Sequence, residues 1–378
     1  MNIERQLNLL EILEKKSCFL FGPRQTGKTH LIRNTLPDYR YYDLLKTDVF
    51  LKLSRSPSRL REEVTKNDKI VIIDEIQKLP VLLDEVHSLI EEQGIHFLLT
   101  GSSARKLRRK GVNLLGGRAR TRRLYPFIHQ ELKEQFDLLK ALDRGFLPSV
   151  YLSDEPYEDL EAYVGTYLKE EIAAEALVRN VPAFSRFLSV AGLCHGKIIN
   201  YSNIASDAEV PVSTVKEYFQ ILRDTLVGDD LPAWKKTRKR KAFSTAKFFL
   251  FDIGVARYLQ NRQGIREQSP EFGEAFESFV YQEIKTYADY NGGQDLCYWR
   301  STSGYEVDFI LNNTTAIEVK GKSNINSRDY KGIKAIKEEA LLSHHIVVSM
   351  EKITRTVDGV EILPWQEFLV RLWQGDFS

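Results

Sequence analysis

Several short, mostly apolar runs occur in the first third of the chain. They cover Ser17–Phe21, Ile70–Ile73 and His96–Leu99, and each is followed at once by a glycine or a polar residue. Unbroken runs of β-branched and other large apolar residues are typical of parallel strands that are buried on both faces. We therefore predict an α/β sheet here, with any ligand at the carboxyl ends of its strands.

A glycine-rich segment follows the first run directly. Residues 22–29 fit the pattern G-x-x-x-x-G-K-[ST], and a helical pattern begins at His30, which is the strand–loop–helix context of a phosphate-binding loop. Backbone N–H groups of such a loop surround phosphates, its lysine (Lys28) reaches the outer phosphates, and its threonine (Thr29) ligates Mg²⁺. The predicted ATP-contacting residues are Gly22, Pro23, Arg24, Gln25, Thr26, Gly27, Lys28, Thr29 and His30.

Two carboxylates end the second run. Asp74 and Glu75 directly follow Ile70–Ile73, at the end of the strand where ligands bind in open α/β sheets. We expect Asp74 to hold Mg²⁺ through water and Glu75 to polarise the water that attacks the γ-phosphate. An Asp-Glu pair after a strand can also cap the next helix, but the phosphate loop upstream favours the catalytic interpretation.

The segment after the third run resembles AAA+ ATPases. Residues 100–103 read Thr-Gly-Ser-Ser, residues 115–118 read Leu-Gly-Gly-Arg and residues 124–127 read Leu-Tyr-Pro-Phe. The same order occurs in a family of predicted bacterial and archaeal AAA+ ATPases with a C-terminal restriction-endonuclease-like domain. The resemblance implies that Thr100 and Ser102 sense the γ-phosphate.

The same resemblance implies an arginine supplied by a neighbouring subunit. Arg118 is the first candidate and Arg120 the second; such an arginine neutralises charge in the transition state. It also implies a homo-oligomer, a hexameric ring being the usual AAA+ form. Two other roles for Arg118 stay open, namely a contact to DNA and a pair with a nearby carboxylate.

The middle of the chain has a helical pattern that ends in a helix-turn-helix rhythm. Apolar residues recur at helical spacing from Gln130, and residues 157–176 form a second helical stretch. Asn200 is expected to open one short helix and Ser213 to cap another over 214–223. This order is typical of a winged helix, whose second helix enters the major groove of DNA. A winged helix used for protein contacts is the alternative.

Two basic stretches lie within a chain whose formal net charge is only +2. Residues 105–123 hold nine lysines and arginines and no acid; this stretch suits nucleic acid, nucleotide or a neighbouring subunit equally. The second stretch lies at the expected wing, where a basic surface tracks phosphates in a salt-sensitive way. Its predicted DNA-binding residues are Lys235, Lys236, Arg238, Lys239, Arg240 and Lys241.

The last third of the chain carries the pattern of a nuclease core. An amphipathic helix from Phe272 to about Tyr290 precedes predicted strands at 296–300, 306–311 and 316–320. Asp308, Glu318 and Lys320 match the D…E-x-K signature of the restriction-endonuclease-like fold, and Glu277 matches its helix glutamate. Asp308 and Glu318 are expected to bind Mg²⁺ at the scissile phosphate, while Lys320 steadies the attacking water or the developing charge. An exposed charged hairpin is the alternative.

This assignment makes a prediction about the loop between the last two strands. Glu318 and Lys320 share one strand face because they are two residues apart. Asp308 lies on the same face only if it can pair directly with Glu318, that is, if the residue numbers of each pair on the two strands add up to an even number. This requires a connecting loop with an odd number of residues, such as 312–314, or a bulge. A two-residue turn without a bulge would put Asp308 on the other face and rule the assignment out.

Composition sets the remaining limits. The chain is 43% hydrophobic and 28% charged, and its three cysteines lie far apart; reduced thiols are expected. Because no apolar run approaches the roughly 20 residues of a membrane span, we expect a soluble, cytoplasmic protein without a membrane partner.

The predicted fold class is α/β throughout. We expect a P-loop AAA+ three-layer αβα domain at 1–128, a helical lid with a winged helix-turn-helix at 129–262, and an α/β restriction-endonuclease-like domain at 263–378. The predicted function is ATP hydrolysis with Mg²⁺ coupled to DNA binding or remodelling, with a metal-dependent nuclease at the C-terminus. Two alternatives stay open: a nucleotide-switched binding module whose nuclease-like domain does not cleave, and an ATPase that acts on protein partners.

Overall fold

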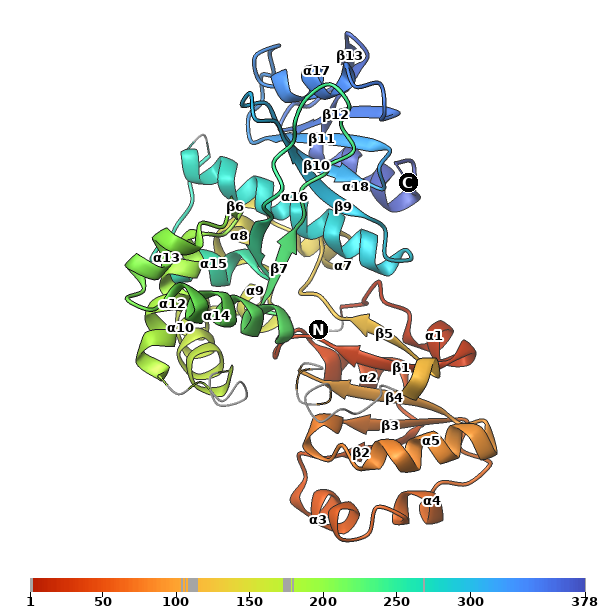
Figure 1. Ribbon diagram of the computed structural model, residues 1–378. Helices are drawn as coiled ribbons and strands as arrows, with labels where there is room; N and C mark the ends of the chain where they lie inside the picture. The colour runs from red at the N-terminus through yellow and green to blue at the C-terminus, as the bar shows by residue number, and fades with distance from the viewer. Residues whose placement is uncertain are drawn as a thin grey trace. The chain divides into compact units, whose positions relative to one another are not determined.

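The computed structural model describes residues 3–102, 105, 107, 115–172, 178, 180–267 and 269–377. The chain divides into two compact units (Figure 1). The first unit comprises Met1–Glu131 with Ile221–Val227, and the second comprises Leu132–Gln220 with Gly228–Ser378. No helix among the described residues is long and apolar enough to cross a membrane.

A five-stranded, fully parallel sheet forms the centre of the first unit. Its strand order is β2-β3-β4-β1-β5. The bounds are β1 Ser17–Phe21, β2 Arg40–Asp43, β3 Ile70–Asp74, β4 His96–Gly101 and β5 Ala119–Arg123. The three predicted strands are therefore confirmed, whereas β2 and β5 were not predicted because they are partly exposed and carry polar side chains.

Both faces of this sheet are buried, as a three-layer α/β/α arrangement requires. Phe19, Val71 and Phe97 pack with the apolar residues of α5 in one core cluster. Their neighbours Leu20 and Ile72 point to the opposite face, because side chains alternate along a strand, and they are equally inaccessible. The helices are α1 Leu9–Lys15, α2 Lys28–Thr35, α3 Thr47–Arg55, α4 Arg59–Glu63, η1 Ile76–Lys78, α5 Leu82–Gln93, η2 Leu115–Gly117 and, at the end of the unit, α7 His129–Leu132.

The second unit begins with short helices and a small antiparallel sheet. Asn200 caps α13 by accepting the N–H groups of Ser202 and Asn203, as predicted. The helices are η3 Lys133–Gln135, α8 Leu138–Arg144, α9 Pro148–Tyr151, α10 Pro156–Ala162, the π-helix η4 Tyr163–Glu171, α12 Val181–Leu193, α13 Tyr201–Asp207, α14 Val212–Asp224, whose residues from Ile221 onward belong to the first unit, and α15 Ile253–Leu259. Strands β6 Lys197–Ile198, β7 Gly228–Leu231 and β8 Lys247–Leu250 pair in the order β6-β8-β7. The expected order of helix, turn, helix and strands is thus present, but α14 begins at Val212, so Ser213 lies in its first turn and is not the predicted cap.

One predicted helical pattern of this region is interrupted, and a second predicted helix is present but changes its pitch. The pattern that begins at Gln130 breaks at Asp137, whose carboxylate accepts the N–H of Lys140 and starts a new helix, α8. The stretch predicted at 157–176 is an α-helix as far as Ala162 and continues as the π-helix η4 to Glu171; residues 173–176 lie outside the described residues. Side-chain caps and changes of helical pitch of this kind do not alter the apolar spacing enough to be visible in the sequence.

A six-stranded mixed sheet forms the rest of the second unit, in the order β13-β14-β12-β11-β10-β9. The bounds are β9 Leu296–Arg300, β10 Glu306–Leu311, β11 Thr315–Lys320, β12 His344–Ser349, β13 Arg355–Val357 and β14 Val360–Pro364. Helices α16 Pro270–Tyr290, α17 Lys331–Lys337 and α18 Trp365–Gln374 complete it. Strands β9, β10 and β11 form an antiparallel meander, and β12 returns parallel to β11. The predicted strands β9 and β10 have the expected bounds, and β11 begins one residue earlier.

The register of β10 and β11 confirms the prediction about the loop. Phe309 pairs with Ile317 and Leu311 pairs with Thr315, so paired positions sum to an even number. The connecting loop is the odd-length segment Asn312–Thr314, with φ of 49° at Asn312. Continuing this register places Asp308 opposite Glu318, on the same face of the sheet.

Candidate active sites

The phosphate loop of the first unit joins the end of β1 to the start of α2. Lys28 is buried, and its Nζ donates to the carbonyl oxygens of Gly22 at 2.7 Å and Pro23 at 3.0 Å. Thr26 Oγ1 also donates to the carbonyl of Pro23, at 2.9 Å. Gly27 has φ of 92°, a conformation that favours glycine. The loop is therefore a closed turn whose lysine is bonded only to carbonyls of the loop among the contacts described.

Two features outside the motif hold this loop in place. A Cβ added at Gly22 would lie 2.6 Å from the backbone oxygen of Leu124, so the loop packs against the segment that follows β5. Arg5 donates to the carbonyls of Thr26 at 2.8 Å and Tyr125 at 2.6 Å. Sequence reasoning missed Arg5, because no motif includes it and only the fold brings it to the loop.

A carboxylate and a hydroxyl meet at the same edge of the sheet. Asp74 accepts hydrogen bonds from the hydroxyls of Thr100, at the end of β4, and Tyr41, on β2. The Thr100 hydroxyl also accepts the N–H of Glu75 at 3.3 Å. Ser102 is buried just beyond. The predicted sensor Thr100 is thus in contact with the predicted metal ligand, and Tyr41 is an addition that the sequence did not indicate.

Glu75 is held in a constrained position next to Asp74. Its φ is 60°, in the left-handed region, and its carboxylate accepts a hydrogen bond from Gln77. A Cβ added at Gly101 would lie 2.3 Å from Gln77 Oε1, so a side chain there would require Gln77 to move. Burial raises the pKa of Glu75 above its usual range, while Lys28 opposes that rise. Burial also lowers the pKa of Lys28 to about 8.

These residues fit ATP and Mg²⁺. Lys28 supplies a buried cation beside the loop, Asp74 supplies a carboxylate for the metal, and Glu75 supplies a base at the same edge. Thr29, His30, Arg24 and Gln25 are exposed around the loop, where a nucleotide would contact them. Oxygen ligands of this kind are those that Mg²⁺ prefers.

The two arginine candidates lie near the amino end of β1, whereas the phosphate loop follows its carboxyl end. Strand β5 runs parallel to β1 with Ser17 opposite Ala119, so Arg118 and Arg120 lie beside the start of β1, whereas the phosphate loop follows its end. Arg118 forms an ion pair with Glu91, near the end of α5. Lys106, Arg108, Arg109 and Lys110, from the same basic stretch, lie outside the described residues.

The second unit brings together all four residues of the predicted nuclease pattern. Asp308 accepts the N–H of Val319 at 2.8 Å, and Glu318 pairs with Lys320 at 2.6 Å. Glu277, on α16, interacts electrostatically with Asp308 and Lys320. Glu318 Oε2 is buried without a hydrogen-bond partner in the part of the chain that is described. The cluster is therefore concentrated in carboxylates and open to a further ligand.

Crowding of these acids shifts their titration. Burial, and next the negative charge of Asp308, raise the pKa of Glu277 to about 7, and the same causes raise the pKa of Glu318. Burial alone would lower the pKa of Lys320, but Asp308 and Glu318 raise it. Within the described ranges no set of three or more His, Cys, Asp or Glu has metal-binding geometry. Asp308 and Glu318 would therefore hold a Mg²⁺ ion as a pair, with water completing its shell.

A further lysine, which sequence reasoning missed, reaches this cluster from the small sheet. Lys247, on β8, lies 2.7 Å from Glu306 and 3.5 Å from Glu277, and its side chain is 6% exposed. The nearby acids raise its pKa despite burial. The signal in the sequence was a single lysine next to the apolar run Phe248–Phe251, where a charge needs a partner.

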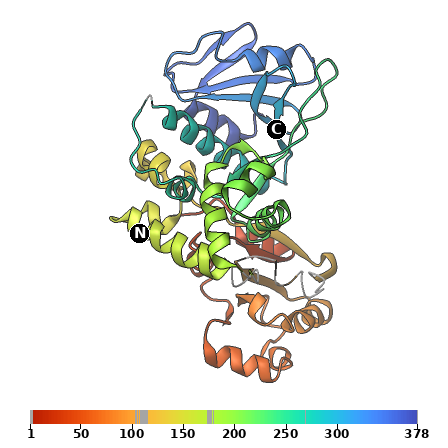
Figure 2. The ribbon, with the colours of Figure 1, turned by 60° about the vertical axis from the view of Figure 1, so that its left-hand side comes forward.

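The predicted basic wing is part of the loop 232–246 between β7 and β8, which packs against its own unit; we call this loop the strap. The loop between β7 and β8 runs along the edge strand β9, with bridges from Ala233 to Tyr298 and from Ala242 to Ser301 (Figure 1, Figure 2). The buried Glu339 accepts the backbone N–H groups of Arg238 and Lys239, both at 2.8 Å.

Two of the six basic side chains of this strap already have partners within the unit. Arg240 pairs with Glu338 and donates to the carbonyl of Ala335 at 2.9 Å, and Lys239 donates to the carbonyl of Glu338 at 2.6 Å. Lys235, Lys236, Arg238 and Lys241 are exposed. Lys239 is exposed as well, and its hydrogen bond to a carbonyl leaves its charge, so among these six only the charge of Arg240 is offset by a described ion pair.

Residues 14–133 match the AAA domain family. This stretch contains the phosphate loop, Asp74 and Thr100, and the first unit is accordingly an ATP-binding domain of AAA type. Residues 135–267 match a domain of unknown function (DUF8612), and residues 272–368 match another (DUF4143). These two matches name no activity, so the restriction-endonuclease-like identity of the last domain stays a prediction.

Two uncharacterized proteins, from Mycobacterium bovis and Mycobacterium tuberculosis, are each 23% identical to this chain in an alignment of 310 residues that covers 77% of this chain. The chain spans 66% of the length of these relatives. Among solved structures, a Signal Transduction ATPase with Numerous Domains (STAND) protein with a tetratricopeptide repeat sensor, from Pyrococcus horikoshii, is 14% identical with a TM-score of 0.24; the match covers 77% of this chain and 48% of that one. This TM-score is too low to establish a shared fold.

Proposed function

We propose that the chain hydrolyses ATP with Mg²⁺ at the first unit and couples this reaction to DNA. The observation that carries the proposal is the meeting of three groups at one edge of a parallel sheet: the Lys28 loop after β1, Asp74 and Glu75 after β3, and Thr100 at the end of β4. Ligands bind at that edge in open α/β sheets.

Each residue has a distinct task in this proposal. The amides of the loop and Lys28 bind the phosphates, while Thr29 and Asp74 hold Mg²⁺, which neutralises charge on the phosphates when bound. Glu75 orients and polarises the attacking water. Gln77 donates a hydrogen bond to the Glu75 carboxylate and fixes its position until substrate binds. Thr100 contacts Asp74 and the backbone of Glu75, which suits a residue that reports on the γ-phosphate.

The position of Arg118 supports action between subunits. Five residues of β1, at about 3.3 Å each, separate the edge where Arg118 lies from the phosphate loop of its own chain. An arginine there serves the site of a neighbouring copy, once it has released Glu91. The proposal therefore includes a homo-oligomer, with Arg120 as the second candidate.

ATP turnover tests the first proposal. Lys28→Ala and Glu75→Gln are each expected to lower turnover by at least about a hundredfold, since each removes a group that acts on the transition state. Lys66→Ala, which changes an exposed lysine of the same unit, is the matched control. Unchanged turnover in Lys28→Ala would overturn the assignment.

Mixing of variants tests the action of Arg118 in trans. Arg118→Ala alone is expected to lose about a thousandfold or more in turnover. Mixed oligomers of Arg118→Ala and Lys28→Ala contain some sites with an intact loop and an intact neighbouring arginine, so turnover is expected to recover in part. No recovery, in mixtures shown to exchange subunits, would place the finger elsewhere.

We propose, second, that the acidic cluster of the second unit hydrolyses phosphodiester bonds. The observation that favours this is the register that places Asp308 opposite Glu318, with Lys320 paired to Glu318. Asp308 and Glu318 would hold a divalent metal, which polarises the scissile phosphate when bound. Lys320 would steady the attacking water, and Glu277, with its pKa near neutrality, would exchange a proton with it.

Cleavage of plasmid DNA and of a single-stranded oligonucleotide, each with Mg²⁺ or Mn²⁺, tests the second proposal. Glu318→Ala is expected to abolish cleavage, and Glu134→Ala, an exposed acid of the same unit, is expected to leave it unchanged. Absence of cleavage by the wild type in every nucleotide state would favour the non-cleaving, nucleotide-switched module.

Duplex binding separates the DNA proposal from an ATPase that acts on protein. Lys235→Glu/Lys236→Glu changes two exposed residues of the strap that make no described contact with α17. Loss of binding to a labelled duplex in this variant supports the DNA contact. No binding by the wild type would support a protein partner.

A further inference from the structure

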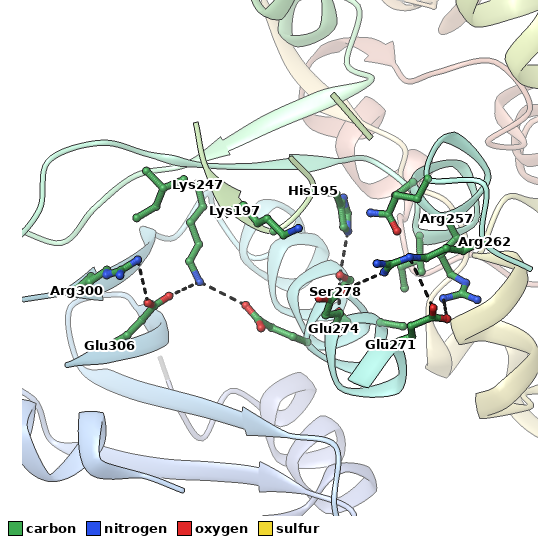
Figure 3. Close-up of a pocket in the computed structure, with 17 residues that line it drawn as sticks. His195, Lys197, Lys247, Arg257, Arg262, Glu271, Glu274, Ser278, Arg300 and Glu306 are labelled. Carbon is green, nitrogen blue, oxygen red and sulfur yellow. Dashed lines mark hydrogen bonds and ion pairs between the residues drawn. The ribbon is translucent and has the colours of Figure 1, made fainter. Parts of the chain in front are cut away.

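A cavity of about 300 Å³ lies within the second unit, beside the acidic cluster (Figure 3). Its walls come from the small sheet at Lys197 and Lys247, from α15, from α16, and from the meander at Arg300 and Glu306. The lining is strongly charged, with five lysines or arginines and four glutamates. A cavity of this size is at the small end of ligand sites.

The acids of this cavity are already neutralised. Glu271, Glu274 and Glu277 are spaced three apart on α16 and so share one face of the helix. Arg262 lies 2.8 Å from Glu274 and 3.8 Å from Glu271, while Lys247 lies between Glu277 and Glu306 (Figure 3). The glutamates therefore leave little negative charge to attract a cation into the cavity.

Two cations of the lining retain charge for a ligand. Lys197, on β6, is exposed and forms no ion pair with any residue that the structure describes. Arg300, at the end of β9, is 41% exposed and lies 3.7 Å from Glu306, a long and weak pair. The cavity thus presents positive charge from two different strands, which suits an anion that extends from one to the other.

An exposed aromatic ring stands next to Arg300. The guanidinium lies 5.4 Å from the centre of the Phe243 ring, and the N–H of Phe243 donates to the carbonyl of Arg300 at 2.8 Å. Phe243 is 39% exposed, although a large apolar side chain is usually buried. Cations along a groove combined with an aromatic ring on which a base can stack are the features of single-strand binding.

We propose that this cavity receives a single strand of nucleic acid, with Lys197 and Arg300 on its phosphates and Phe243 against a base. The inference rests on the proposed phosphodiesterase, because Glu277 belongs both to the cavity wall and to the acidic cluster. A strand held here would lie beside Glu277, which interacts electrostatically with Asp308 of the acidic cluster. A duplex is too wide to enter a cavity of this volume, so the preferred substrate is a strand end or an unpaired segment.

Binding without metal tests this assignment independently of cleavage. Anisotropy of a labelled single-stranded DNA oligonucleotide is measured with the full chain in EDTA over a range of salt concentrations. Lys197→Ala/Arg300→Ala is expected to weaken binding about tenfold, and to lower the slope of log affinity against log salt by about 0.7 for each charge removed. Phe243→Ala is expected to weaken binding about tenfold with the slope unchanged.

A control variant removes the same charges elsewhere. Arg328→Ala/Lys352→Ala changes two exposed cations of the same unit that lie outside the cavity, and is expected to bind like the wild type. Equal losses in both double variants, or wild-type affinity in Lys197→Ala/Arg300→Ala, would overturn the proposal. So would an equal loss of duplex affinity in Lys197→Ala/Arg300→Ala, because the strap and not the cavity is proposed to bind a duplex, or wild-type affinity for a deoxynucleoside monophosphate as high as for the oligonucleotide. If the cavity variant loses binding but the wild type cleaves nothing, the cavity proposal stands and the phosphodiesterase fails.

Discussion

The buried pair of Arg5 and Glu131 gives the sharpest test of how the phosphate loop is held. The side chains are 3% and 1% exposed, and Arg5 Nε lies 2.9 Å from Glu131 Oε2. Arg5 also donates to the carbonyls of Thr26 and Tyr125, and Glu131 accepts the N–H of Gln6 at 2.8 Å. The pair therefore ties the N-terminal segment, the phosphate loop and the segment after β5 together.

Arg5→Met is expected to destabilise the first unit by about 3–5 kcal/mol, because it leaves the Glu131 carboxylate buried without its cation. For a unit of this size that corresponds to about 10–20 °C in Tm. Glu131→Gln is expected to cost less, about 1–3 kcal/mol, because Arg5 keeps its carbonyl acceptors. The double variant Arg5→Met/Glu131→Gln is expected to be less destabilised than the sum of the two, by at least about 1 kcal/mol.

The distribution of tryptophans provides the assay. All four, at positions 234, 299, 365 and 373, belong to the second unit. Far-UV circular dichroism reports on both units during urea unfolding, whereas tryptophan fluorescence reports on the second alone. Arg5→Met is expected to add an early transition to the dichroism curve and to leave the fluorescence curve unchanged. Binding of a fluorescent ATP analogue is expected to weaken in parallel, since the Thr26 carbonyl loses its donor.

Two results would refute this reasoning. If the free energies of the two single variants add to within about 0.5 kcal/mol, the residues are not coupled and the measured cost is that of lost packing. If the fluorescence and dichroism curves shift together, the pair of Arg5 and Glu131 does not stabilise the first unit alone.

Three further predictions follow from single positions. Gly22→Ala is expected to weaken ATP binding and destabilise the first unit by about 1–3 kcal/mol, because the new Cβ would meet the Leu124 oxygen at 2.6 Å; wild-type affinity by titration calorimetry would contradict this. His195 is held neutral by burial, which lowers its pKa to about 4, while its Nδ1 accepts the N–H of Leu250 at 3.0 Å. The unfolded state binds more protons between about pH 6.5 and 4, so stability is expected to fall by about 2 kcal/mol from pH 7 to pH 5, and this loss should be smaller in His195→Gln when followed by tryptophan fluorescence. Deletion of Asn312 shortens the loop Asn312–Thr314 to two residues and is expected to abolish cleavage, because Asp308 then faces away from Glu318. Asn312→Gly keeps the loop length and suits the φ of 49°, so this variant should still cleave. Cleavage by the deletion variant would show that Asp308 takes no part in the reaction.

Local patterns in the sequence were sufficient for the elements that are buried on both faces or that follow a fixed spacing. Strand β1 and the meander strands β9 and β10 have the predicted bounds, since unbroken apolar runs leave few other conformations. The phosphate loop was predicted from its spacing alone. The even register of β10 and β11 was derived as a requirement of the chemistry, and the structure meets it.

Residues that act through distant contacts were beyond such patterns. Arg5 reaches the phosphate loop across 21 positions, and Lys247 reaches Glu306 from another sheet. The strap shows the same limit, because six basic residues within the seven positions 235–241 predict a surface for phosphates. The sequence does not reveal that Glu338 and Glu339 would occupy Arg240. Edge strands such as β2 were missed because half-exposed positions carry a weak apolar signal.

The sequence by itself determined the chemistry available to this protein: a phosphate loop, a strand that ends in two carboxylates, and an Asp…Glu-x-Lys set. These depend on neighbours within a few residues, where spacing translates directly into geometry. Only the tertiary structure decided which charges are neutralised and which stay open to a ligand. That outcome depends on burial and on partners far along the chain, as at Lys247, Arg240 and the Lys197–Arg300 cavity.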